Sequence, residues 1–296
     1  MRELDPGWKG KYAWSVSSES TWRQCKYMFF MRYVALSHRN LDASTRNKLY
    51  TMKKLTSLSM LEGRIIHEMI EDMIQQTRLG RQPQTVMVAD RFWAALLRYK
   101  EKSSETITEA FNGLKIEDTF YELVRKDGES QIRNFIEIVW PRLSNLEYLA
   151  HEEFESFVVN GIRVNVKVDY VTKSPNGKIV LTDWKTGAEK NVLEGGLQMA
   201  VYGMWASSKY NVPISEIMVE LAHLRSAKSH PIKLDDKMVS TAKETIYIGA
   251  SEILATDSVD GFSTNPTPEK CVACPFARVC EDGSQILEEC VEGFVR

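Results

Sequence analysis

Two acidic residues and a lysine lie at the ends of neighbouring predicted strands near the middle of the chain. Asp183-Trp184-Lys185 ends an apolar run that predicts a buried strand, and side chains two residues apart in a strand project from the same face. Asp169 closes the polar face of the preceding predicted strand. Two carboxylates on adjacent strands can hold a divalent ion, and a lysine beside that ion can orient or deprotonate a water. This chemistry suits hydrolysis of a phosphodiester.

The acid-x-Lys pattern by itself is common, and the chain contains a second copy in Asp235-Asp236-Lys237. That copy follows polar sequence after Pro231 and is expected to start a helix. The first copy instead follows a buried strand and a hairpin. A surface ion pair between Asp183 and Lys185 is the alternative interpretation.

Two helical motifs carry polar groups that could join this site. In the helix predicted over 59–78, His67 follows Gly63 by one turn, and the glycine costs helix stability unless something packs close to it. Gln198 and Tyr202 are four residues apart, so they share a face of the helix predicted over 192–208. The alternatives are a structural histidine and a glutamine on the solvent side.

Five cysteines suggest a metal site rather than a disulfide framework, because their number is odd and the start of the chain shows no export signal. Three form the motif Cys271-x2-Cys274-x5-Cys280, which leaves a four-coordinate metal or a cubane cluster one ligand short. Cys25 and Cys290 are the candidates for the fourth ligand, and spacing slightly favours Cys290. Spacing does not separate zinc from iron–sulfur, and buried thiols without a metal are the alternative.

The elements that must position these residues follow from hydrophobic periodicity. Helical patterns are expected over 15–36, 59–78, 192–208 and most of 85–150. Strands are expected over 154–159, 162–169, 178–184 and 214–224, with Asn160-Gly161 as a hairpin turn. Three antiparallel strands, a helix and a further strand predict an α/β core with a mixed sheet.

Composition is that of an ordinary globular chain. The 296 residues are 43% hydrophobic and 26% charged, which argues against disorder. No signal-like start or membrane-length apolar run is visible, so a cytoplasmic protein is expected.

The charges are distributed unevenly, although the net charge is only −2. Residues 1–60 hold 11 Lys/Arg against 4 Asp/Glu, mixed with aromatic residues, whereas 281–296 hold five acids and one arginine. The basic and aromatic segment fits either a surface for phosphates and unstacked bases or a basic helix with an aromatic core face, and the two interpretations stand equal.

Taken in order, these motifs resemble a known family. Their order along the chain resembles the order of motifs in the RecB-like branch of the PD-(D/E)XK nucleases. It resembles more closely that of the iron–sulfur members of this branch: the CRISPR-associated exonucleases, the AddB nuclease domain and their phage relatives. The segment 15–33, a serine-rich cap before a Cys and an aromatic-Arg-Tyr run, also resembles the opening of that family. The motifs are Cys25, Gly63-x3-His67, Asp169, Asp183-x-Lys185, Gln198-x3-Tyr202 and Cys271-x2-Cys274-x5-Cys280.

The resemblance implies an α/β fold with a restriction-endonuclease-like core, in which helices flank a central mixed sheet. It implies a single nuclease domain over 1–296, with a helical insertion and a cluster that joins the N-terminal and C-terminal segments. Its parts are the basic and aromatic segment 1–60, the helical part 61–150 with His67, the catalytic core 151–225, and the helix and iron–sulfur segment 226–296.

The resemblance also implies roles for particular residues. Lys185 would be the catalytic lysine, while Gln198 and Tyr202 would contact DNA or position the site. The implied ligands of Mg²⁺ or Mn²⁺ are His67, Asp169, Asp183 and the carbonyl of Trp184. The implied ligands of a [4Fe–4S] cluster are Cys25, Cys271, Cys274 and Cys280, which would leave Cys290 as a free thiol.

Two positions depart from the family pattern, and a third residue of that pattern is not assigned. Lys26 follows Cys25 where the family usually has proline, and Lys167 stands where a glycine is common. The acidic residue that the family carries before the hairpin is either Glu152 or Glu153, and the sequence does not choose between them.

The expected function is a metal-dependent DNA nuclease, with an exonuclease acting on single strands or DNA ends as the leading form. Recombination, repair, phage DNA processing and CRISPR adaptation all remain open as settings, with matching protein partners. One alternative is a catalytically inactive DNA-binding or scaffold protein with the same fold and cluster. Another is a zinc-stapled protein of unrelated function.

Overall fold

The computed structural model describes residues 6–37, 41–83, 85–187 and 195–294. The chain divides into two compact units, each assembled from separate stretches of sequence. The first comprises Met1–Leu61, Leu97–Tyr121 and Gly249–Arg296; the second comprises Glu62–Leu96 and Glu122–Ile248. A single nuclease domain over 1–296 therefore stays a prediction.

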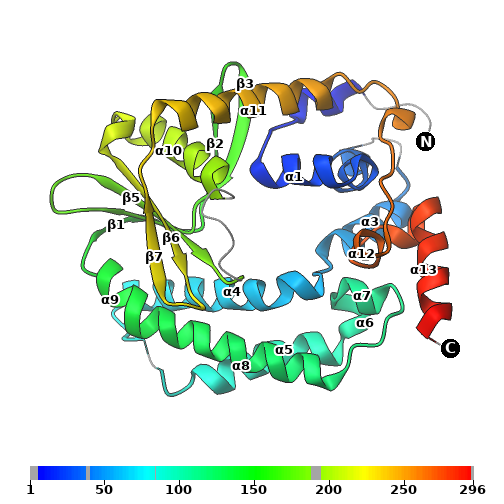
Figure 1. The fold of residues 1–296 in the computed structure, drawn as a ribbon, viewed down its shortest axis with the longest axis horizontal. Helices are drawn as coiled ribbons and strands as arrows, with labels where there is room; N and C mark the ends of the chain where they lie inside the picture. The colour runs from blue at the N-terminus through cyan, green and yellow to red at the C-terminus, as the bar shows by residue number, and fades with distance from the viewer. Residues whose placement is uncertain (1–5, 38–40, 84, 188–194, 295–296) are drawn as a thin grey trace. The chain divides into compact units, whose positions relative to one another are not determined.

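The second unit contains a five-stranded sheet with the order β1-β4-β5-β6-β7 (Figure 1). Its strands are β1 (Glu147–Ala150), β4 (Tyr170–Lys173), β5 (Ile179–Lys185), β6 (Ile217–His223) and β7 (Lys228–Ile232). The β5–β6 pair is parallel and the other three pairs are antiparallel. Helix α10 (Gly196–Tyr210) connects the parallel pair and packs against both of its strands. The α/β class with a central mixed sheet is confirmed.

The hairpin β2 (Phe154–Val159) and β3 (Ile162–Lys167) forms a separate two-stranded sheet. Its turn is as expected, because Asn160 and Gly161 have positive φ angles of 48° and 80°. The prediction that this hairpin and β5 form one three-stranded antiparallel sheet is wrong. The antiparallel neighbour of β5 is β4, which begins directly after Asp169. Apolar alternation runs on from β3 to residue 168, so the pattern hides the break between the strands.

Strand β5 is buried along nearly its whole length, from Ile179 to Trp184. Such burial on both faces is typical of a strand with a parallel neighbour and a helix above it, and it explains the unbroken apolar run. Helix α10 ends at Tyr210, where Asn211 takes the left-handed conformation with φ 52°. The expected start of this helix at 192 falls outside the described residues.

The helices account for most of the remaining chain. Those lying within the first unit are α1 (Val16–Gln24), α2 (Lys26–Phe29), α3 (Ala43–Lys54), α6 (Ser103–Thr106), α7 (Thr108–Phe111), α12 (Pro268–Val272) and α13 (Glu281–Phe294). Four helices carry residues of both units: α4 (Leu58–Arg78), α5 (Val88–Glu101), α8 (Asp118–Asn134) and α11 (Asp236–Leu254). The short α9 (Trp140–Leu143) belongs to the second unit. None of the described helices has the combination of length and apolarity that spanning a membrane requires.

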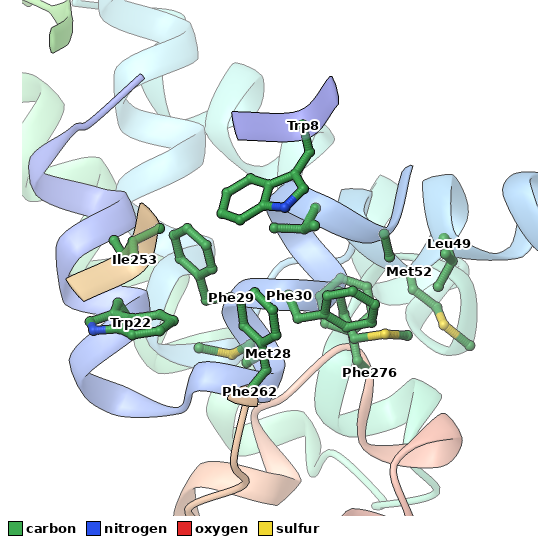
Figure 2. Packing of buried hydrophobic residues seen from close by; sticks show 13 residues of the cluster. Trp8, Trp22, Met28, Phe29, Phe30, Leu49, Met52, Ile253, Phe262 and Phe276 are labelled. Carbon is green, nitrogen blue, oxygen red and sulfur yellow. The ribbon is translucent and has the colours of Figure 1, made fainter. Parts of the chain in front are cut away.

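The aromatic residues of the N-terminal segment form a core of the first unit (Figure 2). Trp22 packs edge-to-face on Phe29 and Phe262, with ring centroids 5.3 and 5.9 Å apart. Trp14 and Phe29 are completely buried. Of the two interpretations of this segment, the aromatic core face is therefore correct for these rings. The helix predicted over 15–36 is interrupted at Cys25, whose backbone is extended between α1 and α2.

Candidate functional site

Helix α4 comes close to the end of β5, and a glycine makes this approach possible. A Cβ atom on Gly63 would lie 2.8 Å from Oγ1 of Thr186, the residue that follows β5. The expectation that something packs close to Gly63 is confirmed. His67 lies one helical turn further along α4, on the same side of the helix. Close packing at Gly63 therefore brings the imidazole toward the edge of the sheet.

His67 meets two carboxylates there. Its Nδ1 atom lies 3.5 Å from Oε1 of Glu152 and 3.6 Å from Oδ1 of Asp169. Among the described residues, this is the one group of three whose ligand atoms all lie within 4.8 Å of one another. Imidazole nitrogen and carboxylate oxygens are donors that divalent ions accept, so the group fits such an ion.

Strand pairing places the two predicted aspartates side by side. Tyr170 pairs with Thr182, so Asp169 and Asp183 lie next to each other at the ends of β4 and β5. The Trp184 amide donates a 2.7 Å hydrogen bond to Oδ2 of Asp169. Burial and the Asp183 charge raise the pKa of Asp169 to about 8. Two neighbouring buried carboxylates repel each other, and a bound cation would relieve that repulsion.

Lys185 and Gln198 form a polar network with Asp183. Lys185 Nζ lies 2.6 Å from Oδ2 of Asp183 and donates a 2.8 Å hydrogen bond to Oε1 of Gln198. The Gln198 amide nitrogen donates to Oδ1 of Asp183 at 3.1 Å and to the Tyr202 hydroxyl at 2.7 Å. Gln198 is therefore not a solvent-side residue. Asp183 is only 3% exposed, so a simple surface ion pair does not describe its contact with Lys185.

Tyr202 closes the network on its far side. Its hydroxyl donates a 2.7 Å hydrogen bond to the carbonyl of Lys167, at the end of β3. Burial raises the pKa of Tyr202 well above its ordinary value, so the hydroxyl keeps its proton and remains a donor. The hairpin is thereby joined to α10 beside the site.

The structure distinguishes between the two glutamates that precede the hairpin. The Glu152 carboxylate faces His67 and forms an ion pair with Lys167, whereas Glu153 lies 3.5 Å from Lys209. Glu152 has a left-handed backbone with φ 52°, which is strained for a residue with a side chain. Its amide donates a 2.9 Å hydrogen bond to the Val168 carbonyl. Sequence reasoning left this residue undecided because nothing in the pattern marks the unusual backbone.

The charges explain the titration of His67. Burial opposes its protonation, but the carboxylates of Glu152 and Asp169 outweigh that effect and raise the pKa of His67. The carboxylates thus favour a positive charge at the position of the imidazole. The sheet-edge site is defined here by His67, Glu152, Asp169, Asp183 and Lys185.

Four cysteines of the first unit line a second place that could hold a metal. Cys25, Cys271, Cys274 and Cys280 all line one cavity with almost entirely apolar walls, called the thiol cavity below. Cys290, which spacing slightly favoured as the fourth ligand, lies on α13 and does not line this cavity. Burial raises the pKa of Cys274 to about 12, so this thiol is protonated unless a metal replaces the proton. The four thiols offer sulfur donors around one cavity, but among the described residues no three of these sulfur atoms lie within 4.8 Å of one another.

The likeness of this chain to curated proteins and to two solved structures is weak. No curated protein matches the chain. Among solved structures, a candidate exonuclease from Eubacterium rectale has 12% identity and a TM-score of 0.35, covering 84% of this chain and 94% of its own. The protein SSO0001 has 14% identity and a TM-score of 0.30, covering 75% and 95%. At such low TM-scores neither likeness adds to the argument.

The sequence itself gives the stronger result. It matches the family model described as the PD-(D/E)XK nuclease superfamily over residues 13–281, a stretch that includes the sheet-edge site and the four cysteines of the thiol cavity. Because this match covers most of its length, the chain belongs to the PD-(D/E)XK nuclease superfamily.

Proposed function

We propose that this nuclease is a metal-dependent DNA exonuclease that acts on single strands or DNA ends. The observation that carries the proposal is the convergence of the imidazole of His67 with three carboxylates and the amine of Lys185. Membership of a nuclease family supports phosphodiester hydrolysis as the reaction. The preference for ends and single strands comes from the resemblance to the exonuclease branch.

The proposed metal ligands are His67, Asp169 and Asp183, with the carbonyl of Trp184 as a further candidate. Glu152 joins this set because its carboxylate lies beside His67. These residues would hold a Mg²⁺ or Mn²⁺, which would supply Lewis-acid chemistry: polarisation of the scissile phosphate and a lower pKa for a water. The ligand atoms of His67, Glu152 and Asp169 lie within 4.8 Å of one another, which favours binding of such an ion.

Lys185 is proposed to orient the attacking water and to offset the negative charge that develops on the phosphate. Its ammonium group is held between the Asp183 carboxylate and the amide oxygen of Gln198. Gln198 uses its amide oxygen and nitrogen within the site, so we assign it a positioning role. Tyr202 supports Gln198 from the side of the hairpin.

The test is cleavage of end-labelled single-stranded and double-stranded DNA, with and without Mn²⁺. Lys185→Met should lower the rate by a factor of about 100 to 1,000, the usual cost of losing one group that stabilises developing charge. Lys237→Met is the matched control, because Lys237 occupies the other acid-x-Lys motif and is exposed. It should cleave like the unaltered protein.

Three results would contradict parts of the proposal. Unchanged cleavage by Lys185→Met rules out this role for the lysine. Binding of single-stranded DNA with no release of nucleotides in Mn²⁺ supports the inactive DNA-binding alternative. Internal fragments without shortening from an end indicate an endonuclease.

We also propose a [4Fe–4S] cluster on Cys25, Cys271, Cys274 and Cys280, as in the iron–sulfur members of the RecB-like branch. Four thiols that line one apolar cavity support the assignment. Cys25 comes from the N-terminal helices and the other three from the C-terminal segment, so the cluster would tie these segments together.

Absorption spectra and metal analysis test this assignment. The protein should be brown, with visible absorption that bleaches on reduction. Cys25→Ser should lose iron, whereas Cys290→Ser should retain it, because Cys290 does not line the cavity. A colourless protein with stoichiometric zinc contradicts the cluster and supports a zinc staple.

A further inference from the structure

Asn112 reaches from the 97–121 segment of the first unit to the turn that carries two of the cysteines. Its side-chain nitrogen donates hydrogen bonds to the carbonyls of Val272 at 2.9 Å and Cys274 at 3.0 Å, and lies 3.5 Å from the carbonyl of Cys271. Asn112 is only 3% exposed. One buried amide group thus contacts three carbonyls within four residues of chain.

These carbonyls gain from a side-chain donor for a physical reason. They lie at and beyond the C-terminus of α12, a helix of five residues, where backbone carbonyls have no partner within the helix. A helix this short does not hold its own shape, and a buried carbonyl without a donor is costly. The local backbone supplies part of the bonding: the Ala273 and Cys274 amides donate to the Cys271 carbonyl, the latter at 3.1 Å, and the Ala277 amide donates to the Cys274 carbonyl at 3.2 Å. Asn112 adds to these bonds and donates to the Val272 carbonyl.

A second contact joins the same two stretches of chain. The guanidinium carbon of Arg278 lies 4.9 Å from the ring centroid of Phe111, the residue before Asn112. Arg278 lies between Cys274 and Cys280. The end of α7 therefore contacts the cysteine segment at two points, with Asn112 at the more buried one.

We propose that Asn112 is a positioning residue for the metal cofactor of the thiol cavity, holding the turn that sets the directions of the Cys271 and Cys274 side chains. The inference rests on the proposed cluster. Groups that fix metal ligands from behind commonly change metal affinity by a factor of about 10 to 100 when they are removed. Asn112 touches no sulfur, so its effect passes through the backbone of the turn.

The experiment uses two variants that remove the donor and keep the shape of the side chain. Asn112→Leu is neutral, and Asn112→Asp keeps a polar group without the amide hydrogens. Iron per chain is measured after anaerobic reconstitution, and loss of the visible absorption is followed in excess chelator. Both variants should lose the cluster about tenfold faster than the unaltered protein or more.

Glu109 provides the matched control. It lies on α7, the short helix that ends just before Asn112, is 6% exposed, and accepts hydrogen bonds from the Leu58 amide at 2.9 and 3.1 Å instead of contacting the cysteine turn. Glu109→Gln should lose the cluster within about twofold of the unaltered rate, well below the effect of removing a supporting group. Comparison of this variant with Asn112→Leu separates positioning of the cysteine turn from a general loss of stability in the 97–121 segment.

Each outcome decides the role of Asn112. Unaltered loss rates in Asn112→Leu, or equal acceleration in Asn112→Leu and Glu109→Gln, overturn the inference. If the protein holds zinc instead of iron, release of zinc about tenfold faster from Asn112→Leu than from the unaltered protein supports the positioning role and refutes the iron–sulfur cluster. If the protein binds neither iron nor zinc, the positioning role of Asn112 and the proposed cluster are both overturned. The nuclease proposal is tested separately by Lys185→Met.

Discussion

The sheet-edge site and the thiol cavity differ in the chemistry of their donors. The sheet-edge site offers carboxylate and imidazole groups, with His67 and Lys185 each about one-third exposed at their side chains. The thiol cavity offers the sulfur atoms of four cysteines, within walls whose exposed surface is almost entirely apolar. Hard oxygen donors suit ions that keep waters and exchange, whereas thiolates suit a metal that stays bound.

The two regions also differ in how their side chains are positioned. At the sheet edge, the strand register places Asp169 beside Asp183, and the ladder of hydrogen bonds holds them there. In the thiol cavity, Cys271 and Cys274 lie on a short helix and a turn, and a side chain from elsewhere in the unit adds hydrogen bonds to those of the local backbone. We infer that the first region suits chemistry that needs access, and the second suits a structural centre.

The largest expected effect is the response to a chelator. EDTA should abolish cleavage by removing the exchangeable ion from the sheet-edge site, and added Mn²⁺ should restore it. The visible absorption of the same sample should persist, because the proposed thiolate-bound metal would exchange slowly in an apolar cavity. Cleavage and absorption are measured together over time. Parallel loss of both signals would remove the distinction between an exchangeable and a structural centre.

The sequence predicts the sheet-edge site better than it predicts the strands that build it. The apolar run before Asp183 marks β5 correctly, and Gly63 correctly signals a close neighbour for α4. The strand β4 is missed because it is four residues long and follows β3 after only two residues. Its absence from the prediction changes the sheet order, yet Asp169 still comes beside Asp183. The residue contacts survive the error because Asp169 directly precedes the strand that pairs with β5.

Glu152 and the aromatic residues show why the rest could not be predicted. The contact of Glu152 with His67 depends on a left-handed backbone that L-residues rarely adopt, and no local pattern specifies it. The rings of Trp14 and Trp22 are equally compatible with a core or with nucleic acid until their burial is known. Both questions concern tertiary contacts, which composition and spacing leave open.

The neighbouring glutamates give the next largest effect. Glu152→Gln should raise the Mn²⁺ concentration for half-maximal cleavage by a factor of about 10 to 100, the range typical of losing a group that supports a metal site. Glu153→Gln should change it little, because Glu153 is paired with Lys209 away from His67. Metal titrations of the two variants compare a charge within the site with the same charge one residue away. Equal shifts in both would show that general electrostatics, and not the position of Glu152, controls metal binding.

The smallest effect concerns the glycines that allow close packing in the two regions. A Cβ on Gly63 would meet a side-chain oxygen of Thr186 at 2.8 Å, whereas a Cβ on Gly283, which lines the thiol cavity, would meet the backbone oxygen of Ala277 at 2.8 Å. Overpacking costs about 1–3 kcal/mol, and alanine regains about 1 kcal/mol of helix propensity over glycine. Gly63→Ala should therefore be nearly neutral or mildly destabilising, and Gly283→Ala should destabilise more.

Thr186→Ala provides the check at the sheet edge, because it removes the oxygen that a Cβ on Gly63 would meet. In that background Gly63→Ala should stabilise the protein by up to about 1 kcal/mol, since only the gain in helix propensity remains. Urea unfolding of the four proteins of this cycle gives the coupling energy between the two positions. A coupling energy near zero would mean that the side chain of Thr186 does not limit the packing of α4 at position 63. The neighbour of a Cβ on Gly283 is a backbone oxygen, which no substitution removes. We therefore expect no second substitution to offset the destabilisation by Gly283→Ala, and the two regions differ in this respect as well.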